Sequence, residues 1–290
     1  MTRTIDTQTQ LCAVIGNPVE HSLSPRMHNA AYQALGLNYV YLAFRVEDVG
    51  SCLRGMRALP TFRGMSVTIP HKVAVMEHLD EIDQLARFVG CVNTITNENG
   101  RLIGTTTDGP GALQALKESG VSLEGRRVLF LGSGGAVRAV AFAAGMQANP
   151  ACITVLGRKE YAVESLCHDL ASGLSVEVNS GTLSENLQDA VENHDVIIHG
   201  TPLGMYPHTM EQSVIPRELL RGHHAVFDMV YRPYKTRLIH DAEAAGCSVV
   251  LGVEMLVHQA VLQFERWTGA KAPYGHMRDT TVNALISSPT

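Results

Sequence analysis

The sequence lacks the features that direct a chain to a membrane or to nucleic acid. No uninterrupted apolar stretch in its 290 residues approaches the length of a membrane span. The apolar run near the start, Leu11 to Ile15, is too short for the core of a signal peptide. No run of Lys or Arg could follow a phosphate backbone, and the formal net charge is only −5. We therefore expect small-molecule partners, anions included, and neither nucleic acid nor membrane.

Cysteine is also not arranged for a metal site or a disulfide framework. The six cysteines stand at positions 12, 52, 91, 152, 167 and 247, without the paired spacing of zinc or redox sites. A chain of this length does not need disulfides to stabilise its fold. No helical zinc motif links the histidines at positions 194, 199, 223 and 224, so we expect core or loop histidines and no metal. A reducing cytoplasm is the expected location.

The composition and the apolar pattern indicate an α/β chain of two domains. With 45% hydrophobic and 18% charged residues, the chain can supply two cores of ordinary domain size. Strands alternate with helices at about residues 24–36 and 48–58, which is typical of a mostly parallel sheet. Strands of this first series are expected at Leu11–Ile15, Val40–Val46 and Met65–Ile69. Asn99-Gly100, between two alternating runs, predicts a hairpin that closes the first domain.

A second series begins at Arg127 and predicts a Rossmann-like, doubly wound domain. Its strands are expected at Val128–Leu131, Ile153–Leu156, Val196–His199 and Ala225–Met229, with helices between them. The first of these helices spans Val137 to Met146. A final helix, Val253 to Thr268, carries Phe264 and Trp267 at a spacing that would pack it against a core.

A glycine-rich turn joins the first strand and helix of the second series. It consists of Gly132, Ser133, Gly134, Gly135 and Ala136. Because glycine permits a tight turn and a close backbone approach, a pyrophosphate can bind at the positive N-terminus of the helix. Val137 replaces the third glycine of the usual dinucleotide fingerprint, so a turn without a ligand is the alternative. We favour nucleotide binding because strand, turn and helix come in the required order.

The residues that follow the next strand bear on the choice of cofactor. Arg158 and Lys159 could bind the 2′-phosphate of NADP through charge-assisted hydrogen bonds. Glu160 could instead accept a hydrogen bond from the free ribose hydroxyl of NAD and repel that phosphate. A solvated helix start is the further alternative for the two basic residues. NADP is favoured, and NAD stays open.

Two segments carry a candidate acid/base pair. Val67-Thr-Ile-Pro-His-Lys72 supplies a lysine just beyond a strand end, and Gly104-Thr-Thr-Thr-Asp-Gly109 supplies an aspartate. A lysine can give a proton to a developing alkoxide, and its pKa falls towards neutrality when it is buried or near another cation. Asp108 could orient Lys72 by a hydrogen bond. The alternatives are a solvated loop lysine and a helix N-cap aspartate.

Together with Gly16-Asn-Pro-Val-Glu-His-Ser-Leu-Ser-Pro25 and Gly252-Val-Glu-Met-Leu-Val-His-Gln259, these segments resemble the shikimate/quinate dehydrogenase family over nearly the whole chain. The resemblance implies a discontinuous substrate-binding domain of residues 1–108 and about 254–290, and an NADP-binding domain of residues 109–253. It also implies reversible NADP-dependent reduction of 3-dehydroshikimate to shikimate, a step in making aromatic amino acids. An NAD-linked quinate/shikimate dehydrogenase is one alternative. A catalytically idle nucleotide-sensing or partner-binding protein is the alternative of another class.

The resemblance also implies roles for individual residues. Lys72 would carry the proton, with Asp108 as its partner. The substrate carboxylate would be bound by Ser22 and Ser24, and its ring hydroxyls by Thr68, Asn93, Asp108, Tyr231 and Gln259. The nicotinamide side would be lined by Met205, Met229 and Gly252, near Thr201, which follows a strand end. The alternatives are helix capping for the two serines, a turn at the sheet edge for Asn93 and core filling for the methionines.

Two positions depart from the usual motifs of the family. Ser66 stands where the family usually has Asn before Val-Thr, and Thr106 stands where it usually has Asn before Thr-Asp. Neither change removes the lysine or the aspartate, but both leave open the choice among shikimate, quinate and aminoshikimate. The sequence leaves a monomer and a homodimer equally open.

Overall fold

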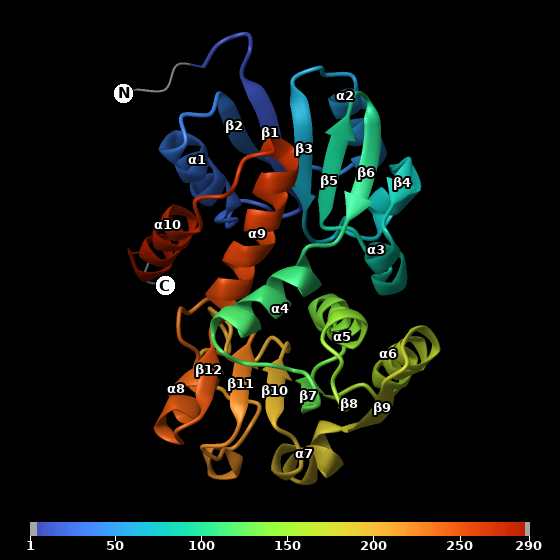
Figure 1. Cartoon of the computed structure of the whole chain (residues 1–290), viewed down its shortest axis with the longest axis vertical. Helices are drawn as coiled ribbons and strands as arrows, with labels where there is room; N and C mark the ends of the chain where they lie inside the picture. Colours follow the sequence, from blue (N-terminus) through green and yellow to red (C-terminus); the bar gives the residue numbers. More distant parts are fainter. Residues whose placement is uncertain (1–4, 288–290) are drawn as a thin grey trace. The chain divides into compact units, whose positions relative to one another are not determined.

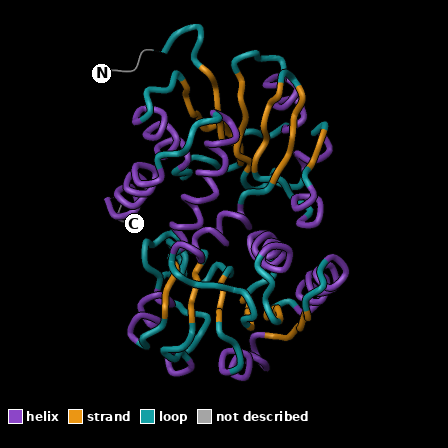
Figure 2. The backbone as a smooth tube through the Cα atoms, in the orientation of Figure 1, coloured by secondary structure: helices purple, strands orange, loops and turns teal. Residues whose placement is uncertain are grey.

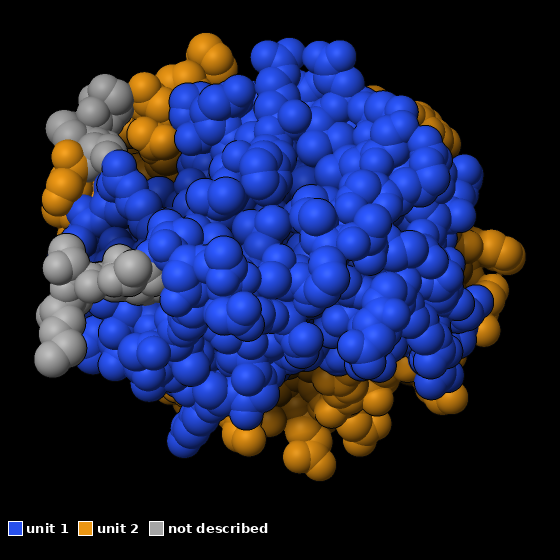
Figure 3. Space-filling view, turned by 90° about the horizontal axis from the view of Figure 1, so that it is seen from above, with its two compact units in different colours: residues 1–107, 257–284 blue, residues 108–256, 285–290 orange. Residues whose placement is uncertain are grey.

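The computed structural model describes residues 5–287, and their contacts divide the chain into two compact units. One unit contains residues 5–107 and 257–284, and the other contains residues 108–256 and 285–287 (Figure 3). The first unit is therefore assembled from two separate stretches of sequence. Within the described residues, no helix is both long enough and apolar enough to cross a membrane.

The first unit is built on one sheet with the strand order β2-β1-β3-β5-β6-β4. Its strands are β1 (Gln10–Gly16), β2 (Tyr39–Arg45), β3 (Phe62–Val67), β4 (Glu81–Ile82), β5 (Thr94–Glu98) and β6 (Arg101–Thr105). Its helices are α1 (Ser24–Ala34), α2 (Val49–Arg57), the 3-10 helix η1 (Ala74–His78), α3 (Gln84–Val89), most of α9 (Gly252–Thr268) and most of α10 (Tyr274–Ser287). Figures 1 and 2 show the strands of this sheet with helices packed around them.

Strand β5 alone runs against the other strands of this sheet. Strands β1, β2 and β3 pair in parallel, β5 is antiparallel to both β3 and β6, and β4 is parallel to β6. The turn between β5 and β6 is Asn99-Gly100, with φ of 54° and 91°, values that these two residues tolerate better than most. The predicted hairpin and the mostly parallel sheet are both confirmed.

The predicted boundaries of β3 were wrong. The strand begins at Phe62, three residues before the expected Met65, because Phe62 pairs with Leu11 of β1. It ends at Val67 rather than at Ile69, because the next residues form a turn in which the amide of His71 donates to the carbonyl of Thr68. This turn carries the chain out of the sheet just before Lys72.

Helix α9 packs on β3 through its only tryptophan, which is 1% exposed. The indole nitrogen of Trp267 donates to the carbonyl of Ile95 at 3.0 Å. A β-carbon at Gly64 would overlap both that nitrogen and the Ile95 carbonyl, so only glycine fits there. His28 stacks on Tyr41 in the same cluster, with ring centroids 4.4 Å apart, and burial lowers the pKa of His28 to about 3. The histidine is therefore neutral and packs as another aromatic ring.

The second unit is a parallel sheet with the strand order β12-β11-β10-β7-β8-β9. Its strands are β7 (Arg127–Leu131), β8 (Cys152–Gly157), β9 (Glu177–Thr182), β10 (Val196–His199), β11 (Ala225–Asp228) and β12 (Ser248–Val250). Its helices are α4 (Asp108–Glu118), α5 (Gly135–Gln147), α6 (Glu160–Gly173), α7 (Leu183–Glu192), the 3-10 helix η2 (Arg217–Leu219) and α8 (Arg237–Ala244). The chain proceeds outward in one direction from β7 and in the other from β10, which confirms the doubly wound domain.

The elements that were not predicted include β9, β12 and α10. Strand β9 lies at the edge of its sheet with no buried residue, and it contains only one aliphatic side chain, Val178. Strand β12 has three residues, and α10 shows no strong apolar face in its sequence. Each of them is positioned by neighbours rather than by a local pattern.

The contact between Gly64 and Trp267 predicts that a methyl group added at position 64 destabilises the protein. We expect Gly64→Ala to lower the free energy of unfolding by about 1–3 kcal/mol, because the core must shift to admit the new atom. Gly55→Ala is the control, since Gly55 lies in α2 with no atom within 4 Å of an added β-carbon. It should be neutral or stabilising by about 0.5–1 kcal/mol. Urea unfolding followed by Trp267 fluorescence measures both, and equal effects would contradict the close packing.

Candidate active site

In the first unit, several candidate substrate residues follow strand ends at one edge of the sheet. Strands β1, β3 and β6 end at this edge, and β5 begins there because it runs in the opposite direction. The amide of Val67 donates to the carbonyl of Asn93 at 2.8 Å, and the amide of Thr68 donates to the carbonyl of Ile15 at 2.9 Å. The reversal of β5 is therefore what places Asn93 beside residues that follow β3.

Thr68 lies against the loop that leads from β1 to the candidate serines. A β-carbon at Gly16 would lie only 2.5 Å from the methyl carbon of Thr68, so the loop and the threonine are in direct contact. The amide of Asn17 donates to the carbonyl of Ile69 at 3.0 Å. One side-chain contact and one backbone hydrogen bond thus join the two loops.

Ser22 and Ser24 lie at the start of α1. The helix begins at Ser24 with a proline in its first turn, and its N-cap is Leu23, which makes no side-chain capping bond. The amide of Ser24 donates to the hydroxyl of Ser22 at 3.3 Å. Capping by Ser24 was therefore a wrong alternative. The amide of Ser22 also donates to the carbonyl of Val19 at 3.1 Å, so the serine is held just before the helix start.

Asn93 is 3% exposed, and its amide group is held in one orientation. Its Oδ1 accepts hydrogen bonds from the backbone amide of Thr107 at 2.8 Å and from the hydroxyl of Thr94 at 2.7 Å. Its Nδ2 donates to the hydroxyl of Thr107 at 3.0 Å. The backbone of Asn93, just before the start of β5, bonds to residues on both sides, Val67 and Thr105.

A buried chain of hydrogen bonds reaches Asn93 from Ser66. The hydroxyl of Ser66 lies 2.6 Å from that of Tyr41 and donates to Oε1 of Gln263 at 2.8 Å. Burial raises the pKa of Tyr41 well above its usual value, so the phenol keeps the proton that it donates to Ser66. Nε2 of Gln263 donates to the hydroxyl of Thr94 at 2.9 Å, and Thr94 bonds to Asn93. Ser66 thus takes part in fixing a candidate substrate residue.

Sequence reasoning missed Tyr41 and Gln263. One signal for Gln263 was available, because it follows Gln259 by four residues and so lies on the same face of α9. Gln259 is 8% exposed and Gln263 is 1% exposed, so this helix face carries two buried amides. No local signal identified Tyr41, whose partner is 25 residues away in the sequence.

Lys72 lies on the turn after β3, and its backbone is fixed. Its carbonyl accepts the amide of Val92 at 2.8 Å, and the ring of its neighbour His71 bonds to the carbonyl of Val46 at 2.8 Å. Lys72 is half-buried, whereas Val73 beside it is 65% exposed. A fully solvated loop lysine does not match this position.

Asp108 is the first residue of α4 and follows Thr107 directly. It is half-buried. The helix it starts is packed tightly on α5, since a β-carbon at Gly109 would lie 2.5 Å from the carbonyl oxygen of Ala139 and 2.6 Å from the β-carbon of Ala143. Lys72 belongs to the first unit and Asp108 to the second.

The glycine-rich turn of the second unit is shaped to admit a ligand. Gly132 has φ of 114°, a conformation that favours glycine, and a β-carbon there would lie 3.1 Å from the carbonyl oxygen of Gly200. Gly134 and Gly135 have no atom within 4 Å of an added β-carbon, so the start of α5 is open. The backbone amides at this helix N-terminus suit a phosphate group, and the residues present fit a dinucleotide.

The candidate ribose residues lie next to this turn. A β-carbon at Gly157, the last residue of β8, would lie 2.6 Å from Val163 and 3.6 Å from the hydroxyl of Ser133. Arg158, Lys159 and Glu160 follow and are exposed. Lys159 is the N-cap of α6 and makes no capping bond with its side chain. Both basic residues therefore follow directly on a residue that lies beside the turn.

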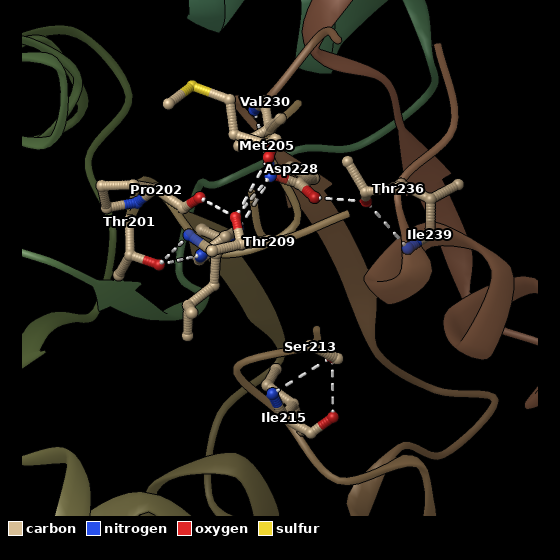
Figure 4. Close-up of polar contacts among 12 residues, drawn as sticks. Thr201, Pro202, Met205, Thr209, Ser213, Ile215, Asp228, Val230, Thr236 and Ile239 are labelled. Atoms are coloured by element: carbon tan, nitrogen blue, oxygen red, sulfur yellow. Dashed lines mark hydrogen bonds and ion pairs between the residues drawn. The ribbon is translucent and has the colours of Figure 1, made fainter. Parts of the chain in front are cut away.

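The loops after β10, β11 and β12 converge in the same unit. A β-carbon at Gly200 would overlap the methyl group of Met229 and lie 2.5 Å from Val137 of α5, and one at Gly252 would lie 2.7 Å from the carbonyl oxygen of Met229. Figure 4 shows Thr201 and Met205 on the loop after β10. Met205 is 47% exposed, so core filling was a wrong alternative for this methionine. Tyr231 is 36% exposed on the loop after β11.

Comparison with known proteins gives a consistent result. Two family models match the chain, the shikimate dehydrogenase substrate binding domain over residues 14–95 and the shikimate 5′-dehydrogenase C-terminal domain over residues 252–280. A shikimate dehydrogenase (NADP(+)) of Methanococcus maripaludis is 40% identical over 285 residues, which are 97% of this chain and 100% of that protein.

Solved structures are similar over nearly their full length. A crystal structure of a shikimate dehydrogenase in complex with NADP+ has a TM-score of 0.91 at 37% identity and covers 97% of this chain and 98% of its own. A quinate dehydrogenase from Corynebacterium glutamicum in complex with NAD has a TM-score of 0.89 at 28% identity and covers 95% of this chain and 99% of its own.

The hydrogen bonds of Ser66 predict a coupled loss of stability. Ser66→Ala leaves Oε1 of Gln263 and the hydroxyl of Tyr41 without their shared partner, so we expect the free energy of unfolding to fall by about 1–3 kcal/mol. Tyr41→Phe removes one end of the same chain of bonds. The double variant should lose less stability than the sum of the two single variants. Additive losses in urea unfolding would show that the two hydroxyl groups act independently.

Proposed function

The chain belongs to the shikimate dehydrogenase family, and we propose that it catalyses the reversible reduction of 3-dehydroshikimate to shikimate with NADPH. The observation that carries the proposal is the edge of the first sheet, where hydroxyl and amide side chains gather close to a half-buried lysine. This set suits a small polyhydroxy acid. Relatives of 40% identity over nearly the whole chain bear the same activity in their name.

We assign the substrate to the first unit and the cofactor to the second. Ser22 and Ser24 would donate hydrogen bonds to the substrate carboxylate from the start of α1. Thr68, Asn93 and Gln259 would bind the ring hydroxyls, and the same role is proposed for Asp108 and Tyr231. Because the amide of Asn93 is already held by Thr94 and Thr107, it meets the substrate in a fixed orientation. A rigid, hydrogen-bonding site discriminates against analogues that lack a hydroxyl.

Lys72 is assigned the proton transfer. As the ring ketone is reduced, negative charge develops on its oxygen, and the ammonium of Lys72 gives that oxygen a proton. In the oxidative direction the neutral amine removes the hydroxyl proton. Asp108 would orient the amine by a hydrogen bond and stabilise its charged form. The backbone bonds at Lys72 and at Thr107 reduce the freedom of both side chains to leave these positions.

The second unit has the residues to bind NADP, which supplies the hydride. The open turn Gly132 to Ala136 would bind the pyrophosphate at the N-terminus of α5. Arg158 and Lys159 would bind the 2′-phosphate with charge-assisted hydrogen bonds. Thr201, Met205, Met229 and Gly252 would line the nicotinamide end. NADP is preferred over NAD in this assignment because two cations outweigh the single carboxylate of Glu160.

Two alternatives make different predictions from the same scaffold. An NAD-linked quinate dehydrogenase would use Glu160 for the ribose hydroxyl. The solved quinate dehydrogenase in complex with NAD shares the fold but is only 28% identical to this chain. A non-catalytic nucleotide-binding protein would not need a lysine and an aspartate at positions 72 and 108. The cytoplasm is the proposed location, and small molecules are the proposed partners.

Initial rates with shikimate and quinate, each paired with NADP+ and NAD+, test the proposal. We expect the highest kcat/KM for shikimate with NADP+. A higher value for quinate or for NAD+ would transfer the assignment to the first alternative. No reduction of cofactor in any of the four mixtures would favour the second alternative.

The proton-transfer assignment predicts the effect of removing one amine. Lys72→Ala should lower kcat by roughly two or more orders of magnitude and change KM for shikimate little, because the lost interaction is made in the transition state. Lys117→Ala, an exposed position in α4, should leave both constants unchanged. A change confined to KM would show that Lys72 only binds the substrate.

The assignment of Arg158 predicts a change in cofactor preference. Arg158→Ala should raise KM for NADP+ about tenfold, as expected for the loss of a hydrogen bond to a charged phosphate, and should leave KM for NAD+ unchanged. Steady-state rates with each cofactor at saturating shikimate measure the two constants. Equal changes for both cofactors would mean that Arg158 does not contact the 2′-phosphate.

A further inference from the structure

His199, the last residue of β10, is a buried group with no role in the site described so far. It is 1% exposed. Its Nδ1 lies 2.9 Å from Oδ1 of Asp228, and its Nε2 lies 2.5 Å from the hydroxyl of Thr201. Because a carboxylate can only accept, Nδ1 carries the proton of the first bond. The imidazole therefore bridges the end of β11 and the start of the loop after β10.

Asp228 is fully buried, and its carboxylate is surrounded by donors. Oδ1 also accepts the amide of Val230 at 3.0 Å, and Oδ2 accepts the hydroxyl of Thr236. Thr236 in turn is the N-cap of α8 and accepts the amide of Ile239 (Figure 4). A buried carboxylate is costly unless it is paired and hydrogen-bonded, and here the donors come from β10, from the loop after β11 and from the N-cap of α8. Asp228 is thus a fixed anchor for the imidazole.

The loop that begins at Thr201 is held together by its own hydrogen bonds. The hydroxyl of Thr201 accepts the amide of Leu203 at 3.2 Å. The hydroxyl of Thr209 donates to the carbonyl of Pro202 at 2.7 Å and accepts the amide of Met205 at 3.1 Å (Figure 4). The loop is therefore connected by its own hydrogen bonds, and Thr201 is its first residue.

A second contact ties this loop to the loop after β11. The amide of Tyr206 donates to the carbonyl of Arg232 at 2.9 Å, and the guanidinium of Arg232 lies 4.8 Å from the centre of the Tyr206 ring. The amide of Met229 donates to the carbonyl of His199 at 2.9 Å. The two loops assigned to the nicotinamide end are thus bonded to each other, and the loop after β11 is also bonded to the backbone of His199.

We propose that His199 is a positioning residue for cofactor binding. It transmits the fixed orientation of the Asp228 carboxylate to the hydroxyl of Thr201, and so holds the loop of residues 201–209 against the nicotinamide end of NADP. The inference rests on the proposed function, because that function assigns Thr201 and Met205 to the cofactor. The side chain touches no substrate and acts through Thr201.

The order Asp228, His199, Thr201 is also the order of groups in the triads of acyl-transfer enzymes. Two observations favour positioning over nucleophilic attack. The imidazole is buried between two strand ends, and the Thr201 hydroxyl already accepts the amide of Leu203 in its own loop. All three residues lie at or just after the ends of β10 and β11, where this fold binds its cofactor, and a role in holding the cofactor loop accounts for them.

His194 provides a matched control within the same unit. It is 6% exposed, its Nε2 lies 2.8 Å from the hydroxyl of Thr154, and its Nδ1 bonds to the carbonyl of Ala190. It is thus another buried histidine bonded to a threonine. It precedes β10, whereas His199 ends that strand, so His194 lies at the end of β10 opposite to the candidate cofactor site.

The test measures binding of two ligands to purified wild type, His199→Asn and His194→Asn by titration calorimetry. The ligands are NADP+ and adenosine 2′,5′-bisphosphate, which has the adenosine half and no nicotinamide. An asparagine amide can still donate to Asp228 but is too short to reach Thr201. We expect His199→Asn to weaken NADP+ binding about fivefold to tenfold, as for one lost hydrogen bond, and to change bisphosphate binding less than about twofold. His194→Asn should bind both ligands as the wild type does.

Thr201→Val removes the same hydrogen bond from the other side and keeps the test open if His199→Asn does not fold. It should weaken NADP+ binding to a similar extent. The double variant should bind NADP+ no more weakly than the more affected of the two single variants, because both changes remove the same hydrogen bond. Unchanged NADP+ binding, or equal weakening of both ligands, would overturn the role of His199. A wild type that bound no NADP+ would instead overturn the proposed function, and this inference with it.

Discussion

The common direction of neighbouring strands is the constraint on which both candidate sites depend. Parallel strands end at the same edge of a sheet, so the residues that follow them are brought together although they are far apart in sequence. In the second unit this edge gathers the turn after β7 and the loops after β8, β10, β11 and β12. In the first unit β5 runs the other way, and its beginning therefore joins the ends of β3 and β6.

Buried polar groups fix the side chains at each edge. A polar group without partners destabilises a protein interior, so a fully bonded group has essentially one orientation. Asn93 is held in this way by Thr94 and Thr107, and Asp228 by Thr236, Val230 and His199. In each unit, a network of buried hydrogen bonds at the sheet edge thus orients the groups that are assigned to the ligands. Such preorganisation reduces the entropy lost when a ligand binds.

The sequence predicted those elements that carry a local signal. The apolar strands β1, β7, β8 and β10 and the Asn99-Gly100 hairpin follow from short-range patterns, and the glycine-rich turn was recognisable from its place between a strand and a helix. The bonds that orient the site were not predictable in this way. Ser66 and its partner Gln263 are 197 residues apart, and the pattern around His199 indicated only a core or loop histidine. Partners that meet through tertiary packing leave no local trace in the sequence.

The reaction proposed for this chain is the transfer of a hydride from NADPH to a ring ketone. The mass of the product tests this reaction most directly. Shikimate is formed from 3-dehydroshikimate with each of two labelled NADPH samples, which carry deuterium on opposite faces of nicotinamide carbon 4. Because the protein would hold the nicotinamide in one orientation, we predict that one of the two labelled cofactors gives shikimate heavier by one deuterium and the other gives unlabelled product. Unlabelled product from both cofactors, or no product from either, would contradict the account.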